Sequence, residues 1–113
     1  MSAIEVDAVE LLRRFCIDDP SVSEERATVR AGGLDERTTA LVRLGALIAL
    51  AAPSASMGAA VDDAVSAGVS AEEIVAVLAR LAGIVGSPRV VAAAPRIAMA
   101  LGYDDELLDV IDV

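Results

Sequence analysis

Apolar residues recur at helical spacing in nearly every segment of the chain, and no alternation typical of a β-strand persists. The clearest case is the range 71–85, where one face carries Ile74, Val77, Leu78, Leu81, Ile84 and Val85. Small residues occupy the opposite side, and only three residues of the range are charged. We therefore expect this helix to be covered nearly all round, in the middle of a bundle or at a subunit interface.

Helix start and stop signals divide the rest of the chain. Two helices are predicted before the break at Ala31-Gly32-Gly33, over 3–16 and 23–29. The next, over 35–52, is expected to bury Leu41, Leu44, Leu47, Ile48 and Ala51. Ser54 is the expected N-cap of a helix over 55–67, and Gly68 suits the left-handed position after it.

The remaining signals complete the predicted fold. Ser70 and Glu73 have the spacing of a capping box for the helix over 71–85. Ser87-Pro88 starts another helix that runs to about residue 101, and a short helix follows Asp104. We therefore predict an all-α, compact helical bundle of about six helices. The range 1–113 is expected to be one domain, with a variable N-terminal arm (1–33), a core (34–101) and an acidic tail (102–113).

Composition adds an expectation of self-association. Hydrophobic residues make up 56% of the chain and aromatic residues only 2%, so the core must consist mainly of Ala, Val, Leu and Ile. A chain of 113 residues has difficulty hiding that much apolar surface. Because large exposed apolar patches are unusual on monomers, we expect a homo-oligomer.

Charge and residue counts exclude several classes of function. The net charge of −9 disfavours nucleic acids and anionic membrane surfaces as partners. The longest apolar run, 44–52, is too short for a membrane span. Cys16 is the only cysteine and there is no histidine, which excludes a disulfide framework, a His-dependent triad and a His or Cys-rich metal site within one chain. We expect a cytoplasmic protein with no signal peptide, metal or cofactor.

Three motifs between residues 34 and 88 carry a family resemblance: LDxRT followed by LVxLxALIAL, then AVSAGVSAEEIxxVL, then LAxxxGxP. Their order and spacing resemble the carboxymuconolactone decarboxylase and alkylhydroperoxidase D-like family. The resemblance implies an alkylhydroperoxidase D-like helical fold and a trimer, hexamer or similar ring-like assembly.

The reactive groups that the resemblance implies are missing. The peroxidase branch of the family uses a Cys-x-x-Cys pair with a nearby Glu and His, and the decarboxylase branch uses a His. The corresponding positions here are Ala40 or Leu41 for the Glu, Ala52 or Pro53 and Ala55 or Ser56 for the cysteines, and Ala59 or Ala60 for the His. A thiol mechanism needs a thiolate and a resolving partner, so we expect no thiol peroxidase activity.

Other residues offer replacement chemistry. Asp62 and Asp63 follow the position of the missing His and are candidate catalytic proton carriers, although adjacent acids on a helix are more often solvated. Arg43, Arg80 and Arg89, with Arg96, are candidates for binding an anionic ligand. The alternative is that these arginines form ion pairs with Asp62, Asp63, Glu72 or Glu73.

Two functions remain in view. The first is a divergent homo-oligomer of this family that lacks thiol peroxidase chemistry and binds a small molecule or a protein partner. The alternative is an enzyme of altered, carboxylate-based chemistry, decarboxylase- or isomerase-like, on a small anionic substrate. An Arg and an Asp that converge on one apolar pocket would favour the enzyme.

Overall fold

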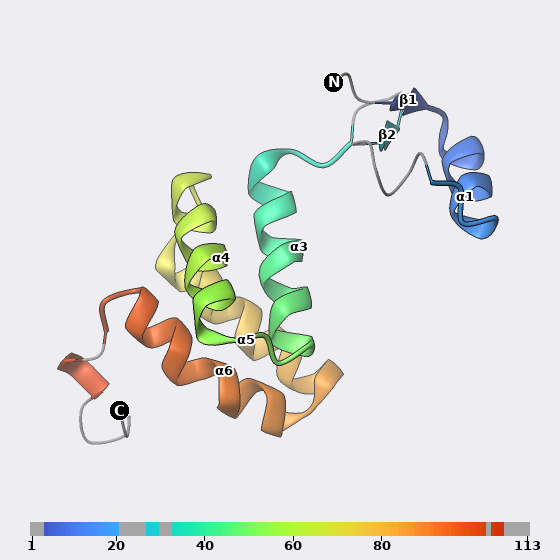
Figure 1. Cartoon of the computed structure of the whole chain (residues 1–113). Coiled ribbons are helices and arrows are strands. Elements are labelled where there is room, and N and C mark those ends of the chain that lie inside the picture. The colour runs from blue at the N-terminus through green and yellow to red at the C-terminus, as the bar shows by residue number, and fades with distance from the viewer. Residues whose placement is uncertain (1–3, 21–26, 30–32, 104, 108–113) are drawn as a thin grey trace. The chain divides into compact units, whose positions relative to one another are not determined.

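A computed structural model describes residues 4–20, 27–29, 33–103 and 105–107. The chain forms two compact units, Met1–Leu34 and Asp35–Val113, and each is described by itself. Figure 1 colours both from the N-terminus to the C-terminus.

The N-terminal unit contains strand β1 (Ile4–Val6), helix α1 (Ala8–Cys16) and strand β2 (Ala27–Val29). β1 and β2 pair in parallel, with Ile4 opposite Ala27 and Val6 opposite Val29. The predicted helix over 3–16 was therefore wrong at its start, and the one over 23–29 was wrong at 27–29; residues 23–26 lie outside the described part. These strands are too short to display an alternating pattern, and their pairing depends on contacts between residues far apart in sequence.

Helix α1 is defined by polar interactions at its start. Asp7 caps it by accepting a hydrogen bond of 2.8 Å from the Glu10 N–H. The Glu10 carboxylate accepts hydrogen bonds from Arg13 and Arg14, at 2.7 Å from the nearest Arg13 nitrogen and 3.3 Å from Arg14 Nε. The Arg13 hydrogen bond holds the pKa of Glu10 down to about 2.

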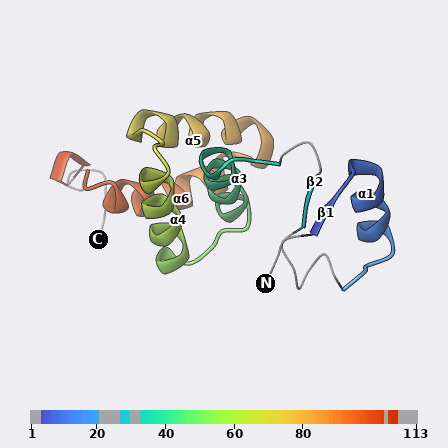
Figure 2. The ribbon, with the colours of Figure 1, turned by 90° about the horizontal axis from the view of Figure 1, so that it is seen from above.

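The second unit consists of α3 (Glu36–Ala49), α4 (Ser54–Ser66), α5 (Ala71–Val85), α6 (Ser87–Ala100) and a short 3-10 helix, η1 (Asp105–Leu107). Each of the four α-helices contacts the other three, as Figures 1 and 2 show from two directions. The all-α class is confirmed. The described residues contain five α-helices where about six were expected, together with the short strand pair.

Hydrogen bonds explain where these helices begin. The Asp35 carboxylate accepts from the Thr38 N–H at 2.7 Å at the start of α3. Hydrogen bonding by the Thr38 side chain, and after it by the Thr38 N–H, lowers the pKa of Asp35. The capping box of α5 is confirmed: Ser70 Oγ accepts from the Glu73 N–H, and the Glu73 carboxylate accepts from the Ser70 N–H. The predicted cap at Ser54 was wrong, because Pro53 already has the extended N-cap backbone and Ser54 is the first helical residue.

Helix α3 ends earlier than predicted, because the chain reverses at Ala51. This residue has a left-handed backbone with a φ of 55°. The Ala51 N–H donates to the Ile48 carbonyl and the Ala52 N–H to the Leu47 carbonyl, the hydrogen-bond pattern of a Schellman C-cap. Gly68 ends α4 in the same way, with a φ of 90° as expected for a glycine. Ala51, predicted to be buried, is instead exposed, and Ala52 is buried.

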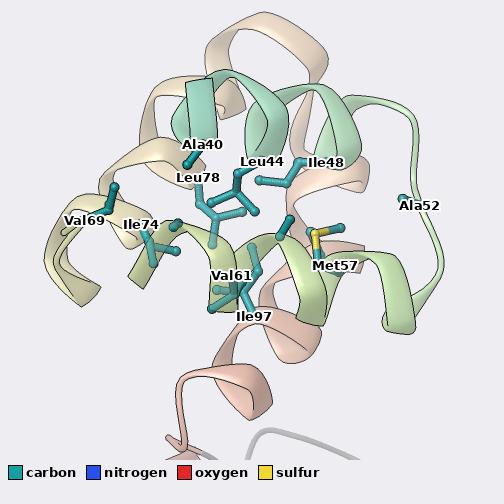
Figure 3. Close-up of a cluster of buried hydrophobic side chains, with 13 residues drawn as sticks. Ala40, Leu44, Ile48, Ala52, Met57, Val61, Val69, Ile74, Leu78 and Ile97 are labelled. Carbon is teal, nitrogen blue, oxygen red and sulfur yellow. The ribbon is translucent and has the colours of Figure 1, made fainter. Parts of the chain in front are cut away.

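The core lies between the four helices (Figure 3). Its buried cluster comprises Ala40, Leu44, Ile48, Ala52, Met57, Ala60, Val61, Ala64, Val69, Ile74, Leu78, Ala93 and Ile97. Leu44 and Ile48, predicted from the spacing in α3, are fully buried, and Leu41 and Leu47 pack against the cluster.

Helix α5 is covered on one side only. Ile74 and Leu78 are buried, Val77 and Leu81 are half-buried, and Ile84 is 76% exposed. The small residues on the other side, Ala76, Ala79, Ala82 and Gly83, are all exposed. A single chain therefore does not provide the cover predicted for this helix, because its three neighbours pack against the Ile74 and Leu78 side.

Candidate functional site

The positions where the resemblance places the reactive groups of the family are packed as core only in part, because Pro53, Ala55, Ser56 and Ala59 are exposed. Ala40, Ala52 and Ala60 are all members of the buried cluster, at 2–8% exposure. Arg96 of α6 donates a 2.6 Å hydrogen bond from Nη1 to the Ala52 carbonyl and so fixes the segment between α3 and α4. In place of thiol, imidazole and carboxylate, Ala40, Ala52 and Ala60 present methyl groups to the interior.

The candidate catalytic residues Asp62 and Asp63 lie on α4 and are exposed. Asp63 Oδ2 is 3.0 Å from Arg43 Nη1, an ion pair that joins α4 to α3 with both side chains more than half exposed. Exposed pairs of this kind contribute about 0–1 kcal/mol to stability. Arg43 thus has the ion-pair partner that the alternative interpretation gave it, and neither aspartate lines the apolar groove that α3 and α5 form between them.

That groove is open and apolar. It encloses about 370 Å³ and is lined by Leu41 and Gly45 of α3 and by Glu73, Ala76, Val77, Arg80 and Leu81 of α5. Figure 2 shows the two helices side by side. A Cβ atom added to Gly45 would lie 3.8 Å from Leu81 Cδ1, an ordinary contact distance. Gly45 and Ala76 therefore keep the groove wide, and Leu41, Val77 and Leu81 give it aliphatic walls.

Two charged side chains reach this groove, and they differ in their partners. Glu73 forms an ion pair with Arg37 of α3 in addition to its role in the capping box. For Arg80, the described part of the chain provides no ion pair or hydrogen bond. The local charge left without a partner in the groove is therefore positive.

The structure brings only one of the three candidate ligand-binding arginines to the groove. Arg80 lines it, Arg43 is paired with Asp63, and Arg89 is exposed in the first turn of α6. An Arg and an acid do converge on an apolar pocket, but the acid is Glu73 rather than an Asp. The hydrophobic pattern predicted that Leu41, Val77 and Leu81 belong to the core. Sequence reasoning missed one signal for the groove, which is Gly45, a glycine within α3 that faces Leu81.

Two further findings concern metal binding and membrane insertion. Within residues 4–20, 27–29, 33–103 and 105–107, no group of three or more His, Cys, Asp or Glu side chains is arranged to hold a metal ion. None of the helices described there has the length and hydrophobicity needed to cross a membrane.

Comparison with known proteins identifies the family. The model of the carboxymuconolactone decarboxylase family matches residues 23–99, which is more than half of the chain. The match contains all three motifs between residues 34 and 88 and extends beyond them at both ends. Searches of curated proteins and of solved structures gave no match. With its helical fold and this match, the chain belongs to the carboxymuconolactone decarboxylase family.

Proposed function

We propose that this chain forms a homo-oligomer that binds a small molecule in the groove between α3 and α5 and has no thiol peroxidase activity. The observation that carries the proposal is the uncovered surface of α5. On one side this helix borders an apolar groove, and on the other it exposes a row of small residues. The groove suits a ligand because it is concave and aliphatic, with few polar groups.

The exposed small residues of α5 support self-association. Ala79 and Ala82 give the outer side of the helix a smooth surface on which another helix can pack closely, and Val75 beside them is 48% exposed. An apolar surface of this kind is removed from water when a second copy covers it. A trimer, a hexamer or a similar closed assembly would supply the cover that a single chain lacks.

The absence of thiol chemistry follows from the residues available. Cys16 is the only cysteine of the chain, and it belongs to the N-terminal unit. The positions that the family resemblance assigns to the cysteines, the Glu and the His carry apolar or hydroxyl side chains, and Ala40, Ala52 and Ala60 among them are buried. Without a second thiol, a disulfide cannot form within the chain during turnover.

Sedimentation velocity tests the assembly. Ala79→Arg places a long charged side chain on the outer side of α5 and should shift the protein from oligomer to monomer. Ala59→Arg is the matched control, because Ala59 is exposed on α4 beside Asp62 and Asp63, and its oligomeric state should not change. A wild-type protein that sediments as a monomer at all concentrations would refute the assembly.

Binding of the neutral apolar dye Nile red tests the groove. Gly45→Met fills the space between α3 and α5 and should lower dye binding at least severalfold. Gly58→Met is the control, because Gly58 lies on α4 outside the groove and a Cβ atom added there meets no atom within 4 Å. Equal dye binding by both variants would show that the groove is not the site.

A hydroperoxide reduction assay tests the absence of thiol peroxidase activity. Activity that is present in the wild type and lost in Cys16→Ser would refute this part of the proposal.

A further inference from the structure

The groove between α3 and α5 combines an aliphatic lining with one cation, and this combination indicates a ligand class. We infer that the groove binds aliphatic monocarboxylates, with the carboxylate on Arg80 and the hydrocarbon chain along Leu41, Val77 and Leu81. The inference rests on the proposed function in one respect, the use of this groove as the ligand site.

The first step of the argument is the shape and chemistry of the walls. Every side chain that lines the groove apart from Glu73 and Arg80 is aliphatic, or absent at Gly45. No aromatic ring is present there to stack on a planar ligand. An alkyl chain gains from such a surface through burial alone, and each buried methylene strengthens binding about three- to fourfold.

The second step is the charge balance. The Glu73 carboxylate forms an ion pair with the Arg37 guanidinium and accepts a hydrogen bond from the Ser70 N–H. Its negative charge is therefore already balanced by Arg37. Arg80 carries a cationic guanidinium, and no described carboxylate forms an ion pair with it. An anionic group at this end of the groove would supply the partner that the described residues do not.

The third step selects the carboxylate and limits its number. The planar guanidinium presents paired N–H donors that match the two oxygens of a carboxylate. The groove contains one such cation, and Glu73 is its only other charged lining residue. A second carboxylate on the ligand would therefore lie against either aliphatic walls or a negative side chain, so a monocarboxylate fits and a dicarboxylate does not.

Isothermal titration of the full chain with hexanoate, octanoate and decanoate, below their micelle concentrations, tests the inference. Affinity should rise about three- to fourfold per methylene, and octanoate should bind about two- to fivefold more tightly than octan-1-ol, because Arg80 is exposed. Arg80→Gln should remove that preference while octan-1-ol binding stays unchanged. Arg89→Gln is the matched control, since it removes the same charge from an exposed arginine of α6 outside the groove, and octanoate binding should stay at the wild-type level.

Three results would overturn the inference. The first is equal affinity for octanoate and octan-1-ol, unaffected by Arg80→Gln, which leaves the groove as an apolar site without carboxylate recognition. The second is an equal loss in the Arg80→Gln and Arg89→Gln variants, which indicates a general effect of charge. The third is octanoate affinity that falls as self-association rises, which places a second copy in the groove. If Nile red binding still falls in Gly45→Met, the proposed function survives the first two results, whereas the third also removes the groove as its ligand site. If neither dye nor carboxylate binds there, both the inference and the proposed function fail.

Discussion

Replacement of Leu44 by alanine tests the arrangement of the helix bundle most directly. Leu44 is fully buried on α3, at the centre of the cluster contributed by the four helices (Figure 3). Leu→Ala substitutions at such sites lose the transfer free energy of the removed atoms and leave a cavity, together about 3 kcal/mol. Leu50 follows the same helix and is 74% exposed, so only about a quarter of its burial energy is at stake in Leu50→Ala, about 0.5 kcal/mol.

The assay is thermal unfolding followed by far-UV circular dichroism at one fixed protein concentration, because self-association makes apparent stability depend on concentration. For a unit of this size, a loss of 1 kcal/mol lowers Tm by about 4–8 °C, so Leu44→Ala should unfold at least 10 °C below the wild type. Leu50→Ala should differ from the wild type by only a few degrees. Equal destabilisation by the two variants would mean that α3 does not point Leu44 into the core.

Four further predictions concern local structure, each measured by the same unfolding assay unless stated. Ala51→Gly should stabilise the protein by about 0.5–1 kcal/mol because it relieves a left-handed backbone at a residue with a Cβ, and a loss of stability would contradict the positive φ. Gly58→Ala should stabilise the protein by a similar amount, because alanine favours the helix more than glycine does and a Cβ atom added at Gly58 inside α4 meets no neighbour. A destabilised variant would reveal a close neighbour. Ser70→Ala should cost about 1 kcal/mol by removing the N-cap of α5, whereas Ser70→Asp should keep most of the stability. The pKa of Glu10 lies at about 2 instead of its ordinary 4.5, so the stabilisation by its ion pair with Arg13 is fully present above pH 4.5 and is lost as the pH falls toward 2. An NMR titration of the Glu10 carboxyl should give a midpoint near 2, and Arg13→Ala should move that midpoint upward. A midpoint near 4.5 in the wild type would disprove the pair.

Sequence periodicity predicted the second unit well because its signals are local. The spacing in α3 placed Leu44 and Ile48 in the core, and the Ser70 and Glu73 capping box set the start of α5. The end of α3 was missed because an alanine occupies the left-handed position after it, where glycine is the residue that a sequence pattern can detect. The β1 and β2 pair was missed because three-residue strands paired across more than 20 positions leave no periodic trace.

The candidate site was less predictable, since it depends on which side chains meet across helices. The sequence suggested that arginines in apolar helices either bind anions or pair with acids, and the structure contains Arg43 paired with Asp63 and Arg80 in the groove. No spacing rule distinguishes these two arginines, because the partner of each is decided by the neighbouring helix. The groove itself depends on Gly45 facing Leu81 across α3 and α5, a relation between residues 36 positions apart.

The hydrogen bond from Arg96 to the Ala52 carbonyl has a consequence for how the bundle opens. It connects α6 to the turn between α3 and α4, across 44 residues of sequence. Detachment of α6 would leave this partly buried carbonyl without a donor, so fraying of the last long helix is coupled to loosening of the turn. The two segments therefore form one cooperative unit in local unfolding, and their amide protons should exchange with solvent through the same opening event.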